Sequence, residues 1–378
     1  MTVAPTVDPR SEAHKGRIRP PTFLGVVRMM YWSAARDPKR LPHLISVLLG
    51  FLHTRTRLWL RRLVDRRDPV AIALMDRLGD VVSVEPVARY ARERFPDAPI
   101  VWFTTQPYAE IVAAYAAIDR VVVVRCLTEW MLLWSTGGFR AVLDLHFNGT
   151  YCLDCVIALE KGGPAAGITG DRHYHYGNQL STRCLCAGLP PIAQGPRLVP
   201  GPAARHRVDA LCLPAEYVVL HCTASDASRE WTDENWLQLT EFIAGNRGVD
   251  VVEIGLSPRA VRANAPRCRS LCGQLSVMET AEVIRRAKLF IGIDIGPAHL
   301  ANATSTRGIV LMGRFRDHDR YMPYSGGYEA GTLSDLVWAE GPVASLPLAL
   351  VLAAVGRRLA VLDPAAGRAE PAISPSGP

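Results

Sequence analysis

The stretch that decides the fold is LFIGIDIGPAHLAN, residues 289–302. Its apolar start is typical of a buried parallel strand, and Pro297 suits the first turn of a helix that follows at once. Asp294 and Gly296 therefore stand at the carboxyl end of a strand, where open α/β sheets bind their ligands. The stretch predicts one strand–helix unit of a parallel sheet.

The same turn is a candidate anion site. Gly296 lets a ligand approach the backbone, and the N–H groups and dipole of a helix start attract a phosphate. His299, in the first turn, adds a donor. The alternative is structural: Asp294 merely caps the helix and His299 fills space.

Similar units recur along the whole chain. Short apolar runs at 69–75, 98–105, 120–124 and 139–147 predict strands, and so do 217–222, 250–255, 289–294 and 307–313. Segments with helical patterns alternate with them, at 107–118, 233–245, 278–287, 297–304 and 346–362, while 78–96 reads as a loop and then a helix. This alternation predicts a doubly wound parallel sheet.

The length of 378 residues suits two such domains. A stretch with five prolines, 189–207, separates the two sets of units. We therefore predict five parts, namely a basic, partly helical extension (1–68), an N-terminal Rossmann-like domain (69–190), a linker (191–207), a C-terminal Rossmann-like domain (208–345), and a terminal helix with a disordered tail (346–378).

Charge is concentrated at the N-terminus. Residues 1–68 hold 14 Lys and Arg against 5 Asp and Glu, whereas the rest of the chain has a net charge of −2. Between Leu41 and Val64 apolar residues recur at helical spacing, with arginines crowding the second half. Two interpretations stay open for 41–67: a helix on an anionic membrane surface, or a helix packed on the first domain.

The composition indicates the cellular compartment and the kinds of partner. No apolar run reaches the roughly 18 residues of a membrane span, and the first 20 residues are polar. Nine scattered cysteines are typical of reduced thiols. We expect a cytoplasmic protein, with contact at the inner membrane face where 41–67 binds it, and no nucleic-acid partner.

Two further loops carry polar side chains at strand ends. HCTASDASREW (221–231) offers the hydroxyls of Thr223, Ser225 and Ser228 and the cation of Arg229, which suit phosphate oxygens. In the N-terminal half, Asp80 follows Gly79 at a strand-to-helix turn. A carboxylate placed there can act as a general base, although an N-cap is the alternative.

Four motifs in order resemble the heptosyltransferase family of inverting glycosyltransferases. They are RLGDVVSVEPVARYARERFPDAPIVWF, HCTASDASREW, AEVIRRAKLFIGIDIGPAHLANA and MGRFRDHDRYMPYS, and they lie between about residues 70 and 330. The resemblance implies two Rossmann-like domains facing across a cleft, the GT-B fold. It also implies a nucleotide-diphosphate sugar such as ADP-heptose in the C-terminal domain and a glycan, glycolipid or small-molecule acceptor in the N-terminal one.

The resemblance also implies residue roles. Asp80 matches the catalytic base, with Gly79 beside it on the acceptor side, and no metal or other cofactor is expected. The donor-site positions are Thr223, Arg229, Asp294, Ile295, Gly296, Pro297 and His299. Arg229 stands where the family usually has Lys, Ile295 where it has Ser or Thr, and Ser257 lies near a missing ribose-binding acid.

Other features left alternatives open. His173 and His175 form either part of the acceptor site or an ordinary polar loop. Cys152 and Cys155 form a Cys-x-x-Cys pair, but no matching second pair follows, which disfavours a metal or redox site. The rival functions are a sugar-nucleotide epimerase on the same fold and a non-catalytic nucleotide-sugar-binding protein.

Overall fold

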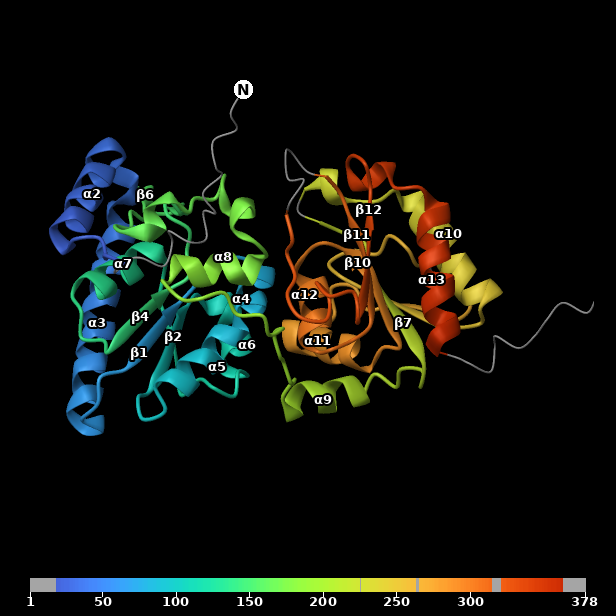
Figure 1. Ribbon diagram of the computed structural model, residues 1–378, viewed down its shortest axis with the longest axis horizontal. Helices are drawn as coiled ribbons and strands as arrows, with labels where there is room; N and C mark the ends of the chain where they lie inside the picture. Colours follow the sequence, from blue (N-terminus) through green and yellow to red (C-terminus); the bar gives the residue numbers. More distant parts are fainter. Residues whose placement is uncertain (1–17, 225, 263–264, 315–320, 363–378) are drawn as a thin grey trace, which may run out of the picture. The chain divides into compact units, whose positions relative to one another are not determined.

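The computed structural model describes residues 18–224, 226–262, 265–314 and 321–362 (Figure 1). The chain forms two compact units: unit 1 comprises residues 1–201 and 318–330, and unit 2 comprises 202–317 and 331–378. Each is an α/β unit built on a parallel sheet, so the predicted fold class is confirmed. The tail from residue 363, which was expected to be disordered, lies outside the described residues.

Unit 1 is built on a four-stranded parallel sheet in the order β3-β2-β1-β4. The strands are β1 (Val70–Ala73), β2 (Ile100–Thr104), β3 (Arg120–Val123) and β4 (Ala141–Asp144). Every residue of β1 and β2 is buried, because helices cover both faces of the sheet. The helices after the strands are α4 (Leu78–Ser83), α5 (Glu85–Arg94), α6 (Ala109–Ala113), α7 (Leu127–Ser135) and α8 (Gln179–Cys186).

One local prediction in unit 1 is wrong. The loop expected after Leu78 is the helix α4, which is followed directly by α5. Pro86 stands in the first turn of α5, where a missing N–H costs no hydrogen bond, and so the two helices are separate elements. Asp80 consequently lies on a helix and not in a loop.

The N-terminal helices belong to the core of unit 1. They are α2 (Phe23–Arg36) and α3 (Leu41–Asp65), joined by the 3-10 turn η1 (Pro38–Arg40). Val26, Leu44 and Phe51 lie in one apolar cluster with residues of β1, β2 and α7. The helix predicted from Leu41 is confirmed, and the packed interpretation holds for one of its faces.

Smaller elements complete unit 1. A two-residue hairpin pairs β5 (Tyr151–Cys152) with β6 (Ile157–Ala158), and the 3-10 turns are η2 (Gln106–Tyr108), η3 (Pro164–Gly167) and η4 (His173–Tyr176). Residues 321–330 return to this unit from far along the chain. The Gln179 N–H donates to Met322 O (2.9 Å), and Asn178 Nδ2 donates to Glu329 Oε2 (2.8 Å).

Unit 2 is built on a six-stranded parallel sheet in the order β12-β11-β10-β7-β8-β9. The strands are β7 (Tyr217–His221), β8 (Asp250–Ile254), β9 (Cys268–Ser270), β10 (Leu289–Ile293), β11 (Gly308–Met312) and β12 (Ser334–Trp338). The sequence did not predict β9 and β12, because both are edge strands with mixed polar and apolar residues. The other four strands were predicted.

The helices of unit 2 follow the strands in the expected alternation. They are α9 (Pro202–Asp209), α10 (Asp233–Glu241), the π-turn η6 (Phe242–Asn246), α11 (Val277–Arg286), α12 (Gly296–Ala303) and α13 (Leu348–Leu362), with 3-10 turns η5 (Ala227–Arg229) and η7 (Val343–Ser345). The stretch 191–201 has no helix or strand, and the rest of the expected linker lies in α9. Within the described ranges, no helix is both long and apolar enough to span a bilayer.

Candidate functional site

In unit 1, Asp80 lies in the first turn of α4 and is held by α8. Arg183 Nη2 donates to Asp80 Oδ1 (2.9 Å), and Gln179 Nε2 donates to the same oxygen. The N-cap residue of α4 is Arg77, so the alternative that Asp80 caps this helix is wrong. The Asp80 side chain is 19% exposed, which leaves it accessible from solvent.

Arg183 joins two carboxylates. Its side chain is only 2% exposed, and Nη2 also donates to Asp76 Oδ2 (2.8 Å) while Nη1 donates to Leu145 O (3.1 Å). The guanidinium lies 3.8 Å from the centre of the Phe147 ring, within range of a cation–π contact. A buried cation with this many partners fixes the position of Asp80.

The two carboxylates sharing Arg183 have different acidities. Burial raises the pKa of Asp80, and the charge of Asp76 raises it further, while Arg183 opposes both effects. For Asp76, burial also raises the pKa, but the charge and hydrogen bond of Arg183 outweigh it and the pKa is lowered. Asp80 is therefore the more basic of the pair, as a proton acceptor should be.

A second buried ion cluster contacts the backbone that follows β1, at Met75, directly before Asp76. Asp144 pairs with Lys161 (2.6 Å) and accepts from Trp130 Nε1 (2.7 Å). His146 Nε2 accepts from the Met75 N–H (2.9 Å), so its Nδ1 donates to Asp144 Oδ2 (2.9 Å). Burial raises the pKa of Asp144, but Lys161 and His146 together hold it well below its usual range. The cluster thus stays charged and rigid.

The predicted acceptor residues His173, His175 and Gly79 differ in their contacts and in their burial. The His173 ring stacks on Phe147 (5.0 Å between centroids), and its Nδ1 contacts Gly170 O at 2.7 Å. Phe147 also contacts Arg183, so a continuous series of contacts connects His173 with Asp80. His175 is exposed and contacts the Tyr174 ring, whereas Gly79 is buried in α4.

In unit 2, Thr223 follows the end of β7 and lies near Gly255, the residue directly after β8. A Cβ built on Gly255 would lie 3.4 Å from both Thr223 Oγ1 and His221 Nε2, and Gly255 has a φ of +136°. A side chain at Gly255 would thus crowd the hydroxyl and impose backbone strain. Burial lowers the pKa of His221 to about 4, so this imidazole is neutral near pH 7.

Arg229, Asp294 and His299 lie together at the ends of β7 and β10. Arg229 Nη1 donates to Asp294 O (3.4 Å), and both side chains act electrostatically on His299. Burial lowers the pKa of His299 to about 4; Arg229 lowers it further and Asp294 opposes the change. His299 is therefore neutral near pH 7 and can donate a hydrogen bond without carrying charge.

The loop that carries Arg229 is held at both ends. Glu230 Oε1 accepts from the Ala224 N–H (2.9 Å), which closes the loop, and the Trp231 indole is buried and donates to Leu346 O (2.8 Å). Ser225, one of the predicted hydroxyls, lies outside the described residues. The loop thus places Arg229 beside the end of β10 through contacts of its neighbours.

The start of α12 has the geometry of an anion site. Ile295 is its N-cap residue, with extended backbone, and Gly296 and Pro297 form the first turn. Because Ile295 and not Asp294 occupies the N-cap position, the alternative that Asp294 is the N-cap residue is wrong. Backbone N–H groups of the first turn, with the helix dipole, can bind a phosphate.

Sequence reasoning missed the residues that organise unit 1. They are Asp76, Phe147, Gln179, Arg183 and Tyr321, whose ring lies 5.7 Å from that of His173. One signal was available, since Arg183 is the one charged residue of QLSTRCLC, a helix whose side chains are nearly all buried. A charged residue on a buried helix face indicates an ion pair.

Two parallel Rossmann-like sheets, each with polar side chains at its strand ends, define the GT-B class of glycosyltransferases. Solved structures share this fold, among them a family 9 glycosyl transferase from Veillonella parvula (TM-score 0.59, 13% identity, 77% of this chain and 97% of that one). A second is the Escherichia coli heptosyltransferase WaaC with ADP (TM-score 0.54, 18% identity, 77% and 99%).

The chain is similar to the heptosyltransferases of glycosyltransferase family 9. The model of this family matches residues 199–333. Lipopolysaccharide heptosyltransferase 1 of Salmonella typhimurium is 25% identical over 287 residues, which cover 65% of this chain and 88% of that relative. The predicted family is confirmed, and the protein is a glycosyltransferase.

Proposed function

We propose that the protein transfers a heptose from ADP-heptose, with inversion, to a hydroxyl of a glycan, glycolipid or small-molecule acceptor. Two of the related solved structures contain ADP or an ADP-2-deoxy-2-fluoro heptose. In this proposal unit 2 binds the nucleotide-diphosphate sugar and unit 1 binds the acceptor, with Asp80 as the general base.

The observation that carries the proposal is how Asp80 is contacted. Both of its side-chain donors, Gln179 and Arg183, contact Oδ1, and within the described residues no donor contacts Oδ2. A carboxylate with one fixed and one open oxygen can take a proton from an acceptor hydroxyl. Its raised pKa favours the same role.

The donor side is proposed on charge and hydrogen bonding. Arg229 and the N-terminus of α12, including Ile295, Gly296 and Pro297, would balance the negative charge of the departing diphosphate. Thr223 and His299 would add neutral donors, and Asp294 would orient Arg229 through its carbonyl. In this proposal these groups stabilise the negative charge of the departing diphosphate without a metal or another cofactor.

The acceptor side is proposed on the aromatic contacts around Asp80. His173 stacks on Phe147 and contacts the Tyr321 ring, and such rings suit the apolar faces of a sugar. Gly79 keeps the start of α4 free of a side chain next to Asp80. His175 is the least supported of these residues, because it is exposed and contacts only its neighbour Tyr174 in the described structure.

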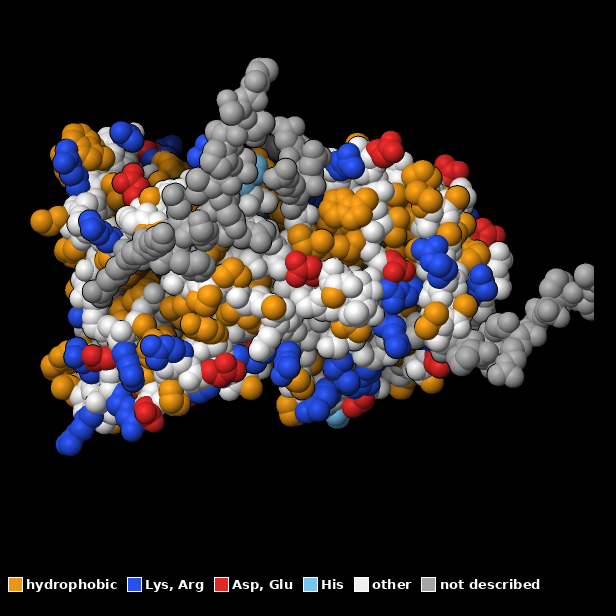
Figure 2. Space-filling view, in the orientation of Figure 1, with side chains coloured by type: hydrophobic (Ala, Val, Ile, Leu, Met, Phe, Trp, Pro, Cys, Tyr) orange, Lys and Arg blue, Asp and Glu red, His pale blue; other side chains and the backbone are white. Residues whose placement is uncertain are grey.

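We also propose peripheral membrane contact through residues 41–67. One face of α3 is packed on unit 1, while the other exposes apolar side chains: Leu41, Ile45, Leu48, Leu49, Leu52, Trp59, Leu60, Leu63 and Val64. Exposed arginines at 57, 61, 62, 66 and 67 lie near its C-terminal end, where Figure 2 shows basic and apolar side chains side by side at the lower left. Such a surface suits an anionic leaflet such as the cytoplasmic face.

The test is ligand-induced stabilisation of the full-length protein by ADP, UDP, GDP, dTDP and their sugar conjugates. A ligand at about 100 times its dissociation constant stabilises the native state by about 2.7 kcal/mol. We expect selective stabilisation by ADP and ADP-heptose. Selectivity for another nucleotide would overturn the donor, and no response at all would favour a non-catalytic protein with another ligand.

Product analysis then separates transfer from epimerisation. With ADP-heptose and a lipopolysaccharide-core acceptor, we expect acceptor-dependent release of ADP. Conversion of the sugar nucleotide into an isomer without any acceptor would instead support the epimerase.

A further inference from the structure

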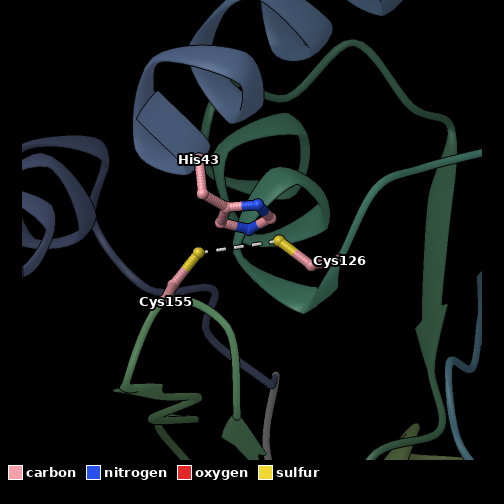
Figure 3. Close-up of side chains that lie close together, drawn as sticks. All are labelled: His43, Cys126 and Cys155. Atoms are coloured by element: carbon pink, nitrogen blue, oxygen red, sulfur yellow. Dashed lines mark hydrogen bonds between the residues drawn. The ribbon is translucent and has the colours of Figure 1, made fainter. Parts of the chain in front are cut away.

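A cluster of sulfur and nitrogen atoms lies in unit 1 away from Asp80. It brings together His43 of α3, Cys126 at the N-cap of α7 and Cys155 in the turn before β6 (Figure 3), and Cys152 of β5 lies three residues before Cys155. The ligand atoms of His43, Cys126 and Cys155 all lie within 4.8 Å of one another. The second pair that the sequence seemed to lack is thus supplied by His43 and Cys126.

The spacing of the sulfur atoms is that of a tetrahedral metal site. Cys126 Sγ and Cys155 Sγ are 3.7 Å apart. With a metal–sulfur bond of about 2.3 Å, two corners of a tetrahedron are about 3.8 Å apart. A disulfide would need about 2.05 Å, so the two thiols are not bonded to each other.

Cys152 adds a third thiol. Its thiol interacts with those of Cys126 and Cys155, although the group of ligand atoms that lie within 4.8 Å of one another comprises His43, Cys126 and Cys155. The three cysteines are buried, at 4%, 4% and 0% exposure for residues 126, 152 and 155. Three thiols and an imidazole are a common ligand set of structural zinc sites, and Cys-x-x-Cys is a common spacing within them.

The imidazole is available to a ligand. His43 Nε2 is buried and has no hydrogen-bond partner among the described residues. In Figure 3 the ring points between the two sulfur atoms of Cys126 and Cys155. An unsatisfied buried nitrogen costs free energy, and coordination would remove that cost.

The turn that carries the Cys-x-x-Cys pair is strained and tightly held. Val156 has a φ of +57°, which is rare for a β-branched residue, and its N–H donates to Cys152 O (2.8 Å). Ser33 Oγ of α2 donates to Cys155 O (2.6 Å). Such strain is typical of ligand clamps, where surrounding contacts enforce the geometry.

We propose that His43, Cys126, Cys152 and Cys155 bind one divalent transition-metal ion of the Zn²⁺ or Fe²⁺ type in a closed tetrahedral site. On binding, the three thiols lose their protons to solvent and the neutral imidazole coordinates through a ring nitrogen. With four protein ligands the site has no open position, so its role is structural. It fixes the N-terminal part of α3 to α7 and to the β5–β6 hairpin.

The first test is elemental analysis of the full-length protein, purified under reducing conditions without chelator. We expect one zinc or one iron ion per chain, and the analysis itself distinguishes the two metals. Reduced metal-free protein titrated with Co²⁺ should show thiolate-to-cobalt charge transfer and tetrahedral d–d bands. Absence of bound metal together with absence of these bands would overturn the proposal.

Variants then test the ligand set. Cys155→Ser and His43→Gln should each abolish the stoichiometric metal and weaken the cobalt bands, whereas Cys184→Ala, at another buried thiol, and Cys212→Ser, at an exposed one, should leave both unchanged. His43 is half-buried, so its variant is the less disruptive of the two. Full retention of metal by His43→Gln and Cys155→Ser would show that the ion lies elsewhere.

A proteolysis assay tests the structural role. Arg36 ends α2, and Lys39 and Arg40 lie in the turn before α3, a few residues before His43. Chelation should accelerate tryptic cleavage there, with a matched digestion of His43→Gln as the control. Equal cleavage with and without metal in the wild-type protein would overturn the fastening role.

Discussion

The two units position their candidate site residues by different means. In unit 1, Asp80 is held by Arg183, which is 103 residues away in sequence and also pairs with Asp76. In unit 2, Arg229 and His299 are placed by a short loop and by the first turn of a helix. The difference is between a site fixed by tertiary ion pairs and one fixed by local backbone.

The two arrangements also differ in how a substitution changes the free energy of folding. Removing one partner of a buried ion pair leaves an uncompensated charge, so substitutions in unit 1 affect folding and acidity together. Substitutions at a loop or helix start leave the core intact and affect binding alone. The predictions below separate these two kinds of behaviour.

The largest expected effect is at Asp80. Asp80→Asn keeps the size of the side chain but removes the base, and we expect kcat to fall by roughly 10²- to 10⁴-fold. Donor binding, followed by thermal shift with ADP, should be unchanged. Asp97→Asn, at an exposed carboxylate of the same unit, is the control. Unchanged turnover by Asp80→Asn would remove Asp80 from the mechanism.

Next in size is the cation of unit 2. Arg229→Gln should weaken ADP binding by roughly 10- to 100-fold, since a hydrogen bond to a charged group contributes about 1.5–3 kcal/mol. Isothermal titration calorimetry measures this directly, and the melting temperature without ligand should not change. Arg262→Gln, at an exposed arginine of unit 2, should bind ADP normally. Equal affinities of the two variants would contradict the donor site.

The success of the sequence-based predictions also differs between the two kinds of site: local patterns were recognised, and tertiary contacts were not. The strand–helix units of both sheets, and the positions of Asp294 at a strand end and of His299 at a helix start, were predicted because these are local patterns. Arg183 and Asp76 were not, since their pairing depends on α8 folding over the end of β1. Asp80 was singled out by its position after a strand, and the resemblance to a family motif added the proposed role of base.

The Cys-x-x-Cys pair shows the same limit. It was disfavoured as a site because no second pair follows it in sequence. The fold brings Cys126 and His43 to it from a helix start and from a helix in the N-terminal extension. A ligand set assembled from three distant segments has no local spacing to recognise.

A smaller effect is expected in the pH dependence of turnover. The base acts when it is ionised, so kcat/KM should decline as pH falls through the raised pKa of Asp80. Asp76→Asn removes a neighbouring negative charge that raises this pKa, and the acid limb should move to lower pH. Arg183→Lys weakens the opposing contact and should move it to higher pH.

Two variants are compared because one of them can fail to fold. Asp76 is 29% exposed, so Asp76→Asn is the better tolerated change, whereas Arg183 is buried. Shifts in opposite directions would confirm that one shared cation sets the acidity of Asp80. Identical profiles for the wild type and Asp76→Asn would mean that the two carboxylates titrate independently.

The smallest effect is expected at the exposed apolar and basic face of α3, which we propose contacts a membrane. This face belongs to unit 1 and has no counterpart among the predicted sites of unit 2. A basic residue near an anionic bilayer contributes about 1 kcal/mol, so Arg61→Gln should weaken binding to vesicles with acidic lipid by about fivefold. Sedimentation with vesicles of neutral lipid alone should show little binding, and added salt should reduce the difference. Arg94→Gln, at an exposed arginine of α5 in the same unit, is the matched control. If both arginine variants bind equally well, the exposed apolar face of α3 contacts something other than an anionic membrane, and the basic end of the helix is only a solvated surface.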